Sequence, residues 1–286
     1  MLSIKLKKYF FKIKTKTKTY IYIVLLFNLI LFYIGKANPN NLLFKPLEAN
    51  HLEARIGSFY EFEDNKLRLD IGNSFDFYKF DIDTNNKISI GADFFILSRL
   101  RSEGRMKFPV ETADYFFGIN SCSKFKIFDL DMASRLRLAH ISSHLIDGYV
   151  NNNNEFLKSP FVYSREFIDI IFAFNEYKNL RPYIGGTYIF STIPKDVKRF
   201  FLELGTDFDY NIYKFISIKG GYDFKLIGVK NNLYIGCNSV QTGVKLNISN
   251  NIGISFLYYY YVGYSIHGMF YNQKDNYNGL GFQINY

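Results

Sequence analysis

Apolar and polar residues alternate along most of this chain, from about Leu52 to the C-terminus. Between Ile216 and Leu226, for example, the even positions are apolar residues and one glycine, while the odd positions carry serine, glycine, lysine and aspartate. Alternation with a period of two is typical of β-strands whose faces meet different surroundings. The pattern predicts twelve strands, at 52–61, 66–79, 87–96, 113–123, 127–143, 164–176, 181–190, 199–210, 214–226, 233–248, 251–264 and 277–286.

Three features of these strands favour a membrane barrel over a soluble sandwich. The strands have about 10 to 14 residues, whereas globular strands average about 5 to 6 and tilted membrane strands need about 9 to 11. Their polar face carries charges of both signs and many glycines, as a barrel interior does. The connections also fall into two classes. They are mostly short at 80–86, 124–126, 177–180, 211–213 and 249–250, and long at 97–112, 144–163, 191–198 and 265–276.

We therefore predict an all-β fold for residues 51–286, a transmembrane antiparallel up-and-down barrel of about twelve strands. The long connections would face the outside of the cell and the short ones the periplasm. Twelve strands leave a narrow lumen that inward side chains fill. A general diffusion porin is therefore disfavoured.

The last strand carries a second signal. Leu280, Phe282, Ile284 and Tyr286 share one face, opposite glycines and amides. A C-terminal strand that ends in an aromatic residue resembles the signal read by the barrel-assembly machinery, with Phe282, Ile284 and Tyr286 as its residues. An open edge in lipid would leave backbone groups unsatisfied, so we expect this strand to pair with the one that starts near Leu52.

The N-terminus reads as an export signal. Residues 1–37 hold eight lysines and no acidic residue, an apolar stretch at Tyr20–Ile34, and small residues at Gly35 and Ala37. We predict a cleaved signal peptide at 1–37, export through the Sec machinery, and a loose periplasmic lead-in at 38–50. The alternative is an uncleaved anchor helix. A stretch of about 15 residues spans only ~22 Å, short of a ~30 Å hydrocarbon core.

Charge and composition narrow the function. The net charge of +9 falls to about +1 once the leader's eight lysines are removed, so a nucleic-acid partner is not expected. The expected partners are outer-membrane lipids, in the outer membrane of a Gram-negative-type bacterium. No metal or cofactor motif is present, so we expect neither. Cys122 and Cys237 would meet an oxidising compartment, and whether they pair is open.

The segment 135–147 gathers side chains capable of chemistry. His140, Ser142 and His144 share a face with Leu136 and Leu138, which places them on the lipid side near the extracellular rim. Arg135, Arg137 and Ser143 take the inward face. There the arginines either pair with acids such as Asp70, Asp93, Asp114, Asp169 or Asp207, or form a strip that binds anions.

Two resemblances arise from these residues. The pattern H-x-S-S-H-L-x-D resembles an uncharacterised bacterial barrel family, domain-of-unknown-function family twelve-oh-seven, over most of the mature chain. Its signature here is Thr112, Asp114, Arg135, Arg137, His140, Ser142, Ser143 and His144, with Ile146 in place of the usual glycine. The resemblance implies an outer-membrane barrel and no established activity.

The second resemblance is local. Outer-membrane phospholipase A is similar in its twelve-stranded plan and its lipid-facing His-x-Ser pair, which His140 and Ser142 match. It implies attack on a lipid ester by Ser142, with His140 as base and an amide, here from Asn151–Asn154, orienting the imidazole. The alternatives are a structural network at the rim and a ligand or metal site at His140 and His144. For the whole protein, three functions stay open: a structural or surface-exposed barrel, a lipid-ester hydrolase and a narrow channel.

Overall fold

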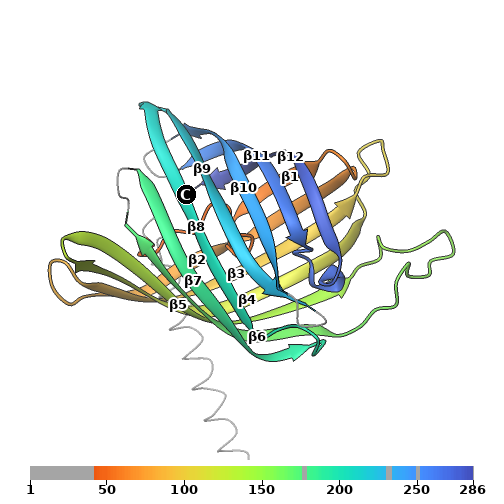
Figure 1. Ribbon diagram of the computed structural model, residues 1–286. Coiled ribbons are helices and arrows are strands. Elements are labelled where there is room, and N and C mark those ends of the chain that lie inside the picture. The colour runs from red at the N-terminus through yellow and green to blue at the C-terminus, as the bar shows by residue number, and fades with distance from the viewer. Residues whose placement is uncertain (1–41, 176–178, 230–233, 249–251, 286) are drawn as a thin grey trace, which may run out of the picture. The chain divides into compact units, whose positions relative to one another are not determined.

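The computed structural model describes residues 42–175, 179–229, 234–248 and 252–285. The predicted signal peptide at 1–37, the start of the lead-in and Tyr286 lie outside these residues. The described chain forms twelve strands, β1 to β12 (Figure 1). Their bounds are β1 Ile56–Glu61, β2 Lys66–Asp81, β3 Lys87–Arg101, β4 Val110–Ile127, β5 Leu130–Leu145, β6 Tyr163–Phe174, β7 Leu180–Ile193, β8 Phe200–Tyr213, β9 Ile216–Gly228, β10 Tyr234–Asn247, β11 Gly253–Tyr264 and β12 Lys274–Asn285.

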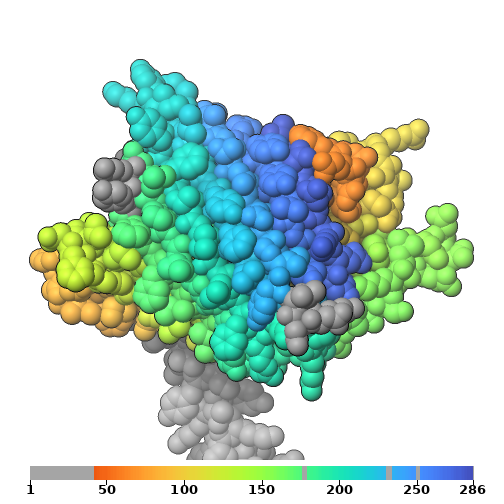
Figure 2. All heavy atoms as spheres, viewed as in Figure 1, coloured from red at the N-terminus to blue at the C-terminus, as the bar shows by residue number. Residues whose placement is uncertain are grey.

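The strands close into one antiparallel barrel, in which each strand pairs with its sequence neighbours and β1 pairs with β12. The closing register places Ile56 opposite Ile284 and Tyr60 opposite Leu280. The predicted fold class, strand number and closing pair are therefore confirmed. From the side shown in Figure 2, the wall made by β8 to β12 forms a continuous surface.

The two faces of the wall follow the alternation in the sequence. Outward residues such as Ile71, Phe94 and Leu280 are exposed by 50 to 55 % although they are apolar. The inward positions hold most of the buried charged residues of the strands, including Arg68 and Asp223. An apolar exterior around a polar interior is the arrangement of barrels that lie in lipid. No helix among the described residues is long and apolar enough to cross a membrane.

The two ends of the barrel differ in their connections. The end that we call the turn end has the connections 82–86, 128–129, 175–179, 214–215 and 248–252. The opposite, loop end has the connections 62–65, 102–109, 146–162, 194–199, 229–233 and 265–273. The β4–β5 hairpin turns through Phe128 and Asp129, both at positive φ, as a two-residue type I′ turn requires. The longest connection, 146–162, projects beyond the wall (Figure 2).

Residues 42–55 correct two predictions. We expected a loose lead-in to residue 50 and a strand from 52, but this stretch lies inside the barrel and β1 begins only at Ile56. Nine of its residues are at most 7 % exposed, among them Phe44, Leu47 and Glu53. The stretch lacks a period because the lumen surrounds most of it, so its side chains do not alternate between a buried and an exposed face. We call it the luminal segment.

Polar contacts fix the luminal segment to the wall along its whole length. Its backbone and side chains bind groups on β2, β5, β7, β8 and β9. The contacts are Leu43 N with Asp76 Oδ2 (2.7 Å), Arg181 with Lys45 O and Pro46 O (both 2.8 Å), Lys219 Nζ with Glu48 Oε1 (2.6 Å), Asn50 Nδ2 with Glu203 Oε1 (2.6 Å), and Arg135 with Glu53. The segment therefore rises from the turn end toward the loop end and returns to start β1.

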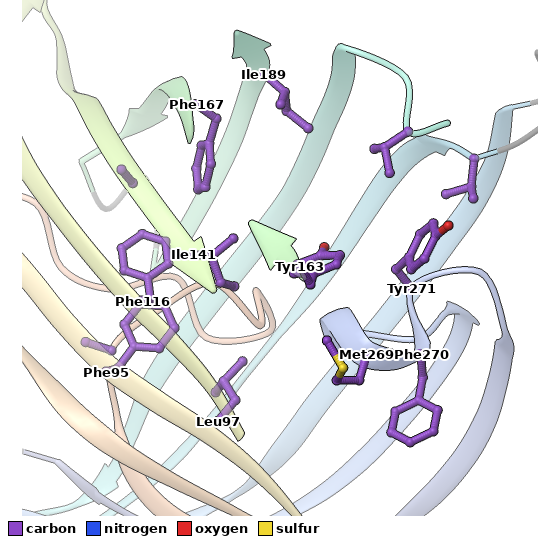
Figure 3. Close-up of a cluster of buried hydrophobic side chains, with 14 residues drawn as sticks. Phe95, Leu97, Phe116, Ile141, Tyr163, Phe167, Ile189, Met269, Phe270 and Tyr271 are labelled. Atoms are coloured by element: carbon purple, nitrogen blue, oxygen red, sulfur yellow. The ribbon is translucent and has the colours of Figure 1, made fainter. Parts of the chain in front are cut away.

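A second piece of chain enters the barrel at its other end. The connection 265–273 contains a short 3-10 helix, η2 (Gly268–Phe270), whose residues are all buried. Figure 3 shows Met269 and Phe270 of η2 among side chains that point inward from the strands. Arg99 lies over the Phe270 ring at 3.7 Å. The lumen is thus filled from both ends by the protein's own chain.

Candidate functional site on the outer wall and the residues behind it

The strand β5 presents its two faces as predicted. Leu136 and Leu138 are exposed by 49 % and 46 % on the outer side, together with His140, Ser142 and His144. The inner face carries Arg135, Arg137 and Ser143, each at most 2 % exposed. The segment 135–144 therefore divides into a luminal half and a lipid-facing half.

The luminal arginines hold other parts of the chain. Arg135 donates from both terminal nitrogens to Glu53, at 2.8 and 2.6 Å. Arg137 donates to Asp169 at 3.1 and 3.0 Å and to the carbonyl of Leu52 at 3.0 Å. Two-pronged ion pairs of this kind are strong and directional. Asp169 was among the predicted partners of the arginines, whereas Glu53 was not.

Three further signature residues hold the loop end together. Asp114 accepts from His267 Nδ1 and from Gly268 N, both at 2.7 Å. Ser143 Oγ accepts from Met269 N at 3.1 Å, and Thr112 Oγ1 donates to His144 O at 2.9 Å. The contacts of Asp114 and Ser143 fix η2 to β4 and β5, and that of Thr112 joins the two strands to each other.

A phenol also joins two connections at the loop end. Tyr271 donates to both carboxylate oxygens of Asp196, at 2.9 and 3.0 Å. Burial, together with the Asp196 carboxylate, raises the pKa of Tyr271 to about 12. The phenol therefore keeps its proton, and with it this hydrogen bond, through the ordinary pH range.

The lipid-facing half of β5 forms a polar cluster with β6. His140 Nδ1 lies 2.9 Å from Glu166 Oε1, and Ser164 Oγ donates to the same oxygen at 2.7 Å. The register places His140 opposite Glu166 and Ser142 opposite Ser164. The side chains of His140 and Glu166 are exposed by 45 % and 32 %. The contact between His140 and Glu166 therefore lies on the outer face of the wall, at positions where the neighbouring outward side chains toward the turn end are apolar.

The amide that we expected to orient His140 lies elsewhere. Asn151 caps its own turn, where its Oδ1 accepts from Asn153 N and Glu155 N at 2.8 and 3.0 Å. The group beside His140 Nδ1 is instead the carboxylate of Glu166. Among the described residues, no hydrogen bond joins Ser142 to His140. His144 meets the Tyr115 ring edge-on at 5.9 Å between centroids, and no group of three or more His, Cys, Asp or Glu in the described part of the chain is arranged to hold a metal ion.

The sequence-based prediction did not include Glu166 or Glu53, for two different reasons. Glu166 interrupts an outward face of β6 that continues with Ile168, Ile170 and Phe172, so an acid there is a usable signal. Identifying Glu166 as the partner of His140 requires the register between β5 and β6, which cannot be derived from the sequence alone. Glu53 lies in a segment without a period and meets Arg135 across 82 positions of sequence.

The sequence model of the protein family DUF1207, described as "Protein of unknown function", matches residues 29–286. The chain belongs to the DUF1207 family. The family resemblance seen in the signature residues is therefore confirmed. Seven of those eight residues, all but Ser142, make the contacts described above. No curated protein matches this DUF1207 member in sequence.

Solved structures show the fold. The DUF1207 barrel is similar to outer membrane phospholipase A from Escherichia coli, with a TM-score of 0.52, 12 % identity, and coverage of 90 % of this chain and 97 % of that one. It is also similar to the Salmonella typhi outer membrane phospholipase dimer with bound calcium, with a TM-score of 0.53, 10 % identity, and coverage of 87 % and 96 %. At these identities the likeness establishes an outer-membrane type of barrel and nothing about activity.

Proposed function

We propose that this DUF1207 member is a closed outer-membrane barrel that works through its outer wall and surface connections rather than as a diffusion channel. The observation that carries the proposal is the ion pair between Arg135 and Glu53, which holds the luminal segment inside the barrel. The filled loop end at η2 supports it. Export through the Sec machinery, insertion by the barrel-assembly machinery and residence among outer-membrane lipids belong to the same proposal.

Planar-bilayer recording tests the closed lumen. We expect the folded wild type to give no stable conductance steps. A variant that lacks residues 42–52 should conduct where it folds, because it loses the segment that occupies the lumen. Folding of each sample is checked by heat-modifiable migration on a gel. Stable steps from the wild type would reject the proposal and favour the narrow channel.

One observation favours a second candidate function, lipid-ester hydrolysis at the outer wall. Glu166 is an acceptor, so in a neutral imidazole its contact favours the tautomer with the proton on Nδ1, in which Nε2 keeps its lone pair. An imidazole oriented by a carboxylate is the base of serine hydrolases. Ser142 lies two residues away on the same strand face, about 7 Å along the backbone, so side-chain rotation must bring its hydroxyl to His140.

The chemistry would follow the usual acyl-transfer course. His140 Nε2 takes the proton of Ser142 as its Oγ attacks the ester carbonyl, and returns it to the leaving alcohol. Water then releases the fatty acid from the acylated serine by the same proton transfers in reverse roles. Glu166 keeps the imidazole in place and stabilises its charged form.

Fatty-acid release from phospholipid in mixed micelles tests this candidate. We expect hydrolysis by the wild type, loss of it in Ser142→Ala, and a fall of at least about a hundredfold in Glu166→Gln. Ser134→Ala is the matched control, because Ser134 also lies on the outer face of β5 and, among the described residues, its hydroxyl bonds that of Ser123 alone. Activity that survives in Ser142→Ala but disappears in Ser164→Ala would move the nucleophile to β6. No hydrolysis by the folded wild type would reject the candidate.

A further inference from the structure

A cavity of about 90 Å³ remains inside the barrel above the luminal segment. It is bounded below by His51 and Leu52, above by the connection that follows β11, and at the sides by inward residues of β5 to β11. Figure 3 shows four of its wall residues, Ile141, Tyr163, Phe167 and Ile189, pointing inward from their strands. Most of its lining is apolar, which suits the body of a small organic ligand.

The acids in the cavity wall already have partners. Glu203 accepts from Asn50 Nδ2 at 2.6 Å and meets Lys225 Nζ at 3.3 Å. Asp223 accepts from Tyr183 OH at 2.8 Å and from Lys225 Nζ at 2.7 Å. The hydrogen-bond acceptors on this side of the cavity are therefore satisfied.

Two donors in the same wall are not satisfied. His51 Nδ1 lies 3.2 Å from Arg68 Nη1, and because a guanidinium only donates, Nδ1 must accept. The ring proton is then on Nε2, which is buried and has no partner among the described residues. His51 as a whole is only 7 % exposed. A buried donor left without an acceptor is rare in native proteins and calls for an occupant.

Arg165 is the second donor. Its Nε is buried and has no hydrogen-bond partner in the described part of the chain. Its guanidinium lies over the rings of Tyr163, at 5.0 Å, and Phe201, at 5.8 Å, and forms no ion pair with a described carboxylate. The other luminal arginines considered above, Arg135, Arg137 and Arg181, each meet an acid. Arg165 thus brings to a mostly apolar cavity a guanidinium that has no ion-pair partner among the described carboxylates.

We propose that this cavity is a binding site for a small carboxylate with a short apolar body. The carboxylate accepts from Arg165 and from His51 Nε2, and the body packs against Ile141, Phe167 and Ile189. Planar guanidinium groups match carboxylates in geometry, which favours this anion over a halide. The volume limits the body to a few carbons, because an apolar cavity that binds benzene has a volume of about 150 Å³. The site is independent of the closed lumen's role and of hydrolysis at the outer wall.

Isothermal titration of the folded protein in detergent micelles tests the site, with butyrate as the probe. We expect saturable one-site binding of butyrate, no binding of butylammonium, which has no acceptor, and no binding of 2-naphthoate, which is too large. These three ligands test the wild type alone, so the result does not depend on any variant folding. Absence of butyrate saturation, or equal binding of butylammonium, would overturn the proposal.

Variants then locate the bound anion. Arg165→Gln should weaken butyrate binding at least tenfold, and Thr187→Leu should abolish it by filling the cavity that Thr187 lines. Arg105→Gln is the control, since Arg105 is exposed in the connection 102–109 and should bind like the wild type. Butyrate bound by folded Arg165→Gln as tightly as by the wild type would place the anion elsewhere and refute the assignment.

Discussion

Arg135 and Arg137 sit two residues apart on the inner face of β5, yet they stabilise different parts of the molecule. Arg135 holds the luminal segment through Glu53, while Arg137 joins β5 to β6 through Asp169 and caps the carbonyl of Leu52. Each is at most 2 % exposed, so each depends on its partner to neutralise a buried charge. Buried ion pairs of this kind add little stability in total, but losing one partner is costly.

This dependence yields a prediction for Glu53. Glu53→Gln keeps the shape of the side chain but leaves Arg135 buried without its main counter-charge, and we expect it to lower the free energy of unfolding by about 3–5 kcal/mol. The measurement is the urea midpoint of the barrel in detergent or lipid.

Glu63→Gln is the matched control for that experiment, because Glu63 is exposed and, in the described part of the chain, accepts a hydrogen bond from Asn278 alone. It should change the free energy of unfolding by no more than about 0.5 kcal/mol. An equally small effect of Glu53→Gln would show that the luminal segment contributes little to stability.

For single residues, the sequence predicts which face of the wall a side chain takes better than it predicts which residue that side chain contacts. The period of β5 places Arg135, Arg137 and Ser143 inward and His140, Ser142 and His144 outward, as the structure has them. The partners Glu53 and Glu166 depend on a segment without a period and on a strand register, and neither follows from local alternation. Cys122 and Cys237 are both buried and form no disulfide, a question that spacing had left open.

Among the strands, β1 and β12 have backbones that approach each other very closely. They form the seam that closes the barrel, and glycines of both strands lie there. A Cβ added to Gly279 would lie 1.8 Å from the Tyr60 carbonyl oxygen, far inside van der Waals contact. The seam therefore depends on a close approach of the two backbones.

We expect Gly279→Ala to weaken the seam and lower the free energy of unfolding by at least about 1–3 kcal/mol, the usual effect of forced overpacking. The readout is the fraction of heat-modifiable protein after refolding, together with the urea midpoint. Gly186→Ala on β7 is the control, because its added Cβ would have an ordinary contact of 3.5 Å with Phe201 O. Similar behaviour of the two variants would show that the seam tolerates a wider spacing.

The strand predictions were accurate where one face meets lipid and less so at the ends. β3 and β4 reach Arg101 and Val110, beyond the predicted ends at 96 and 113, because pairing with a neighbour continues past the point where apolar residues alternate. β1 is shorter than predicted, since residues 52–55 bind the lumen rather than continuing the strand. The alternation of residues shows which face of a strand is apolar, but it does not show how far backbone pairing continues past the alternating segment.

For the whole molecule, the difference in connection length between the two ends of the barrel predicts how the barrel is oriented in the membrane. The long connections gather at the loop end and the short ones at the turn end, as the sequence indicates. We expect a thiol at Asn152→Cys, in the connection 146–162, to react with an impermeant maleimide on intact cells. A thiol at Asp83→Cys, in the turn 82–86, should react only after the cells are opened.

The native protein serves as the background for this labelling, because Cys122 and Cys237 are buried. Labelling of Asp83→Cys but not Asn152→Cys on intact cells would reverse the proposed orientation. Labelling of neither variant on intact cells would contradict exposure of the loop end at the cell surface.

The luminal segment also sets the mechanical behaviour of the protein. Its contacts with the wall follow one another along the chain. In order they join Leu43 to Asp76, Lys45 and Pro46 to Arg181, Glu48 to Lys219, Asn50 to Glu203, and Glu53 to Arg135. A force applied ahead of residue 42 would load these bonds in series, each only after the one before it has broken. The segment should therefore leave the barrel in successive small steps, one for each contact that breaks, before the seam between β1 and β12 bears any tension.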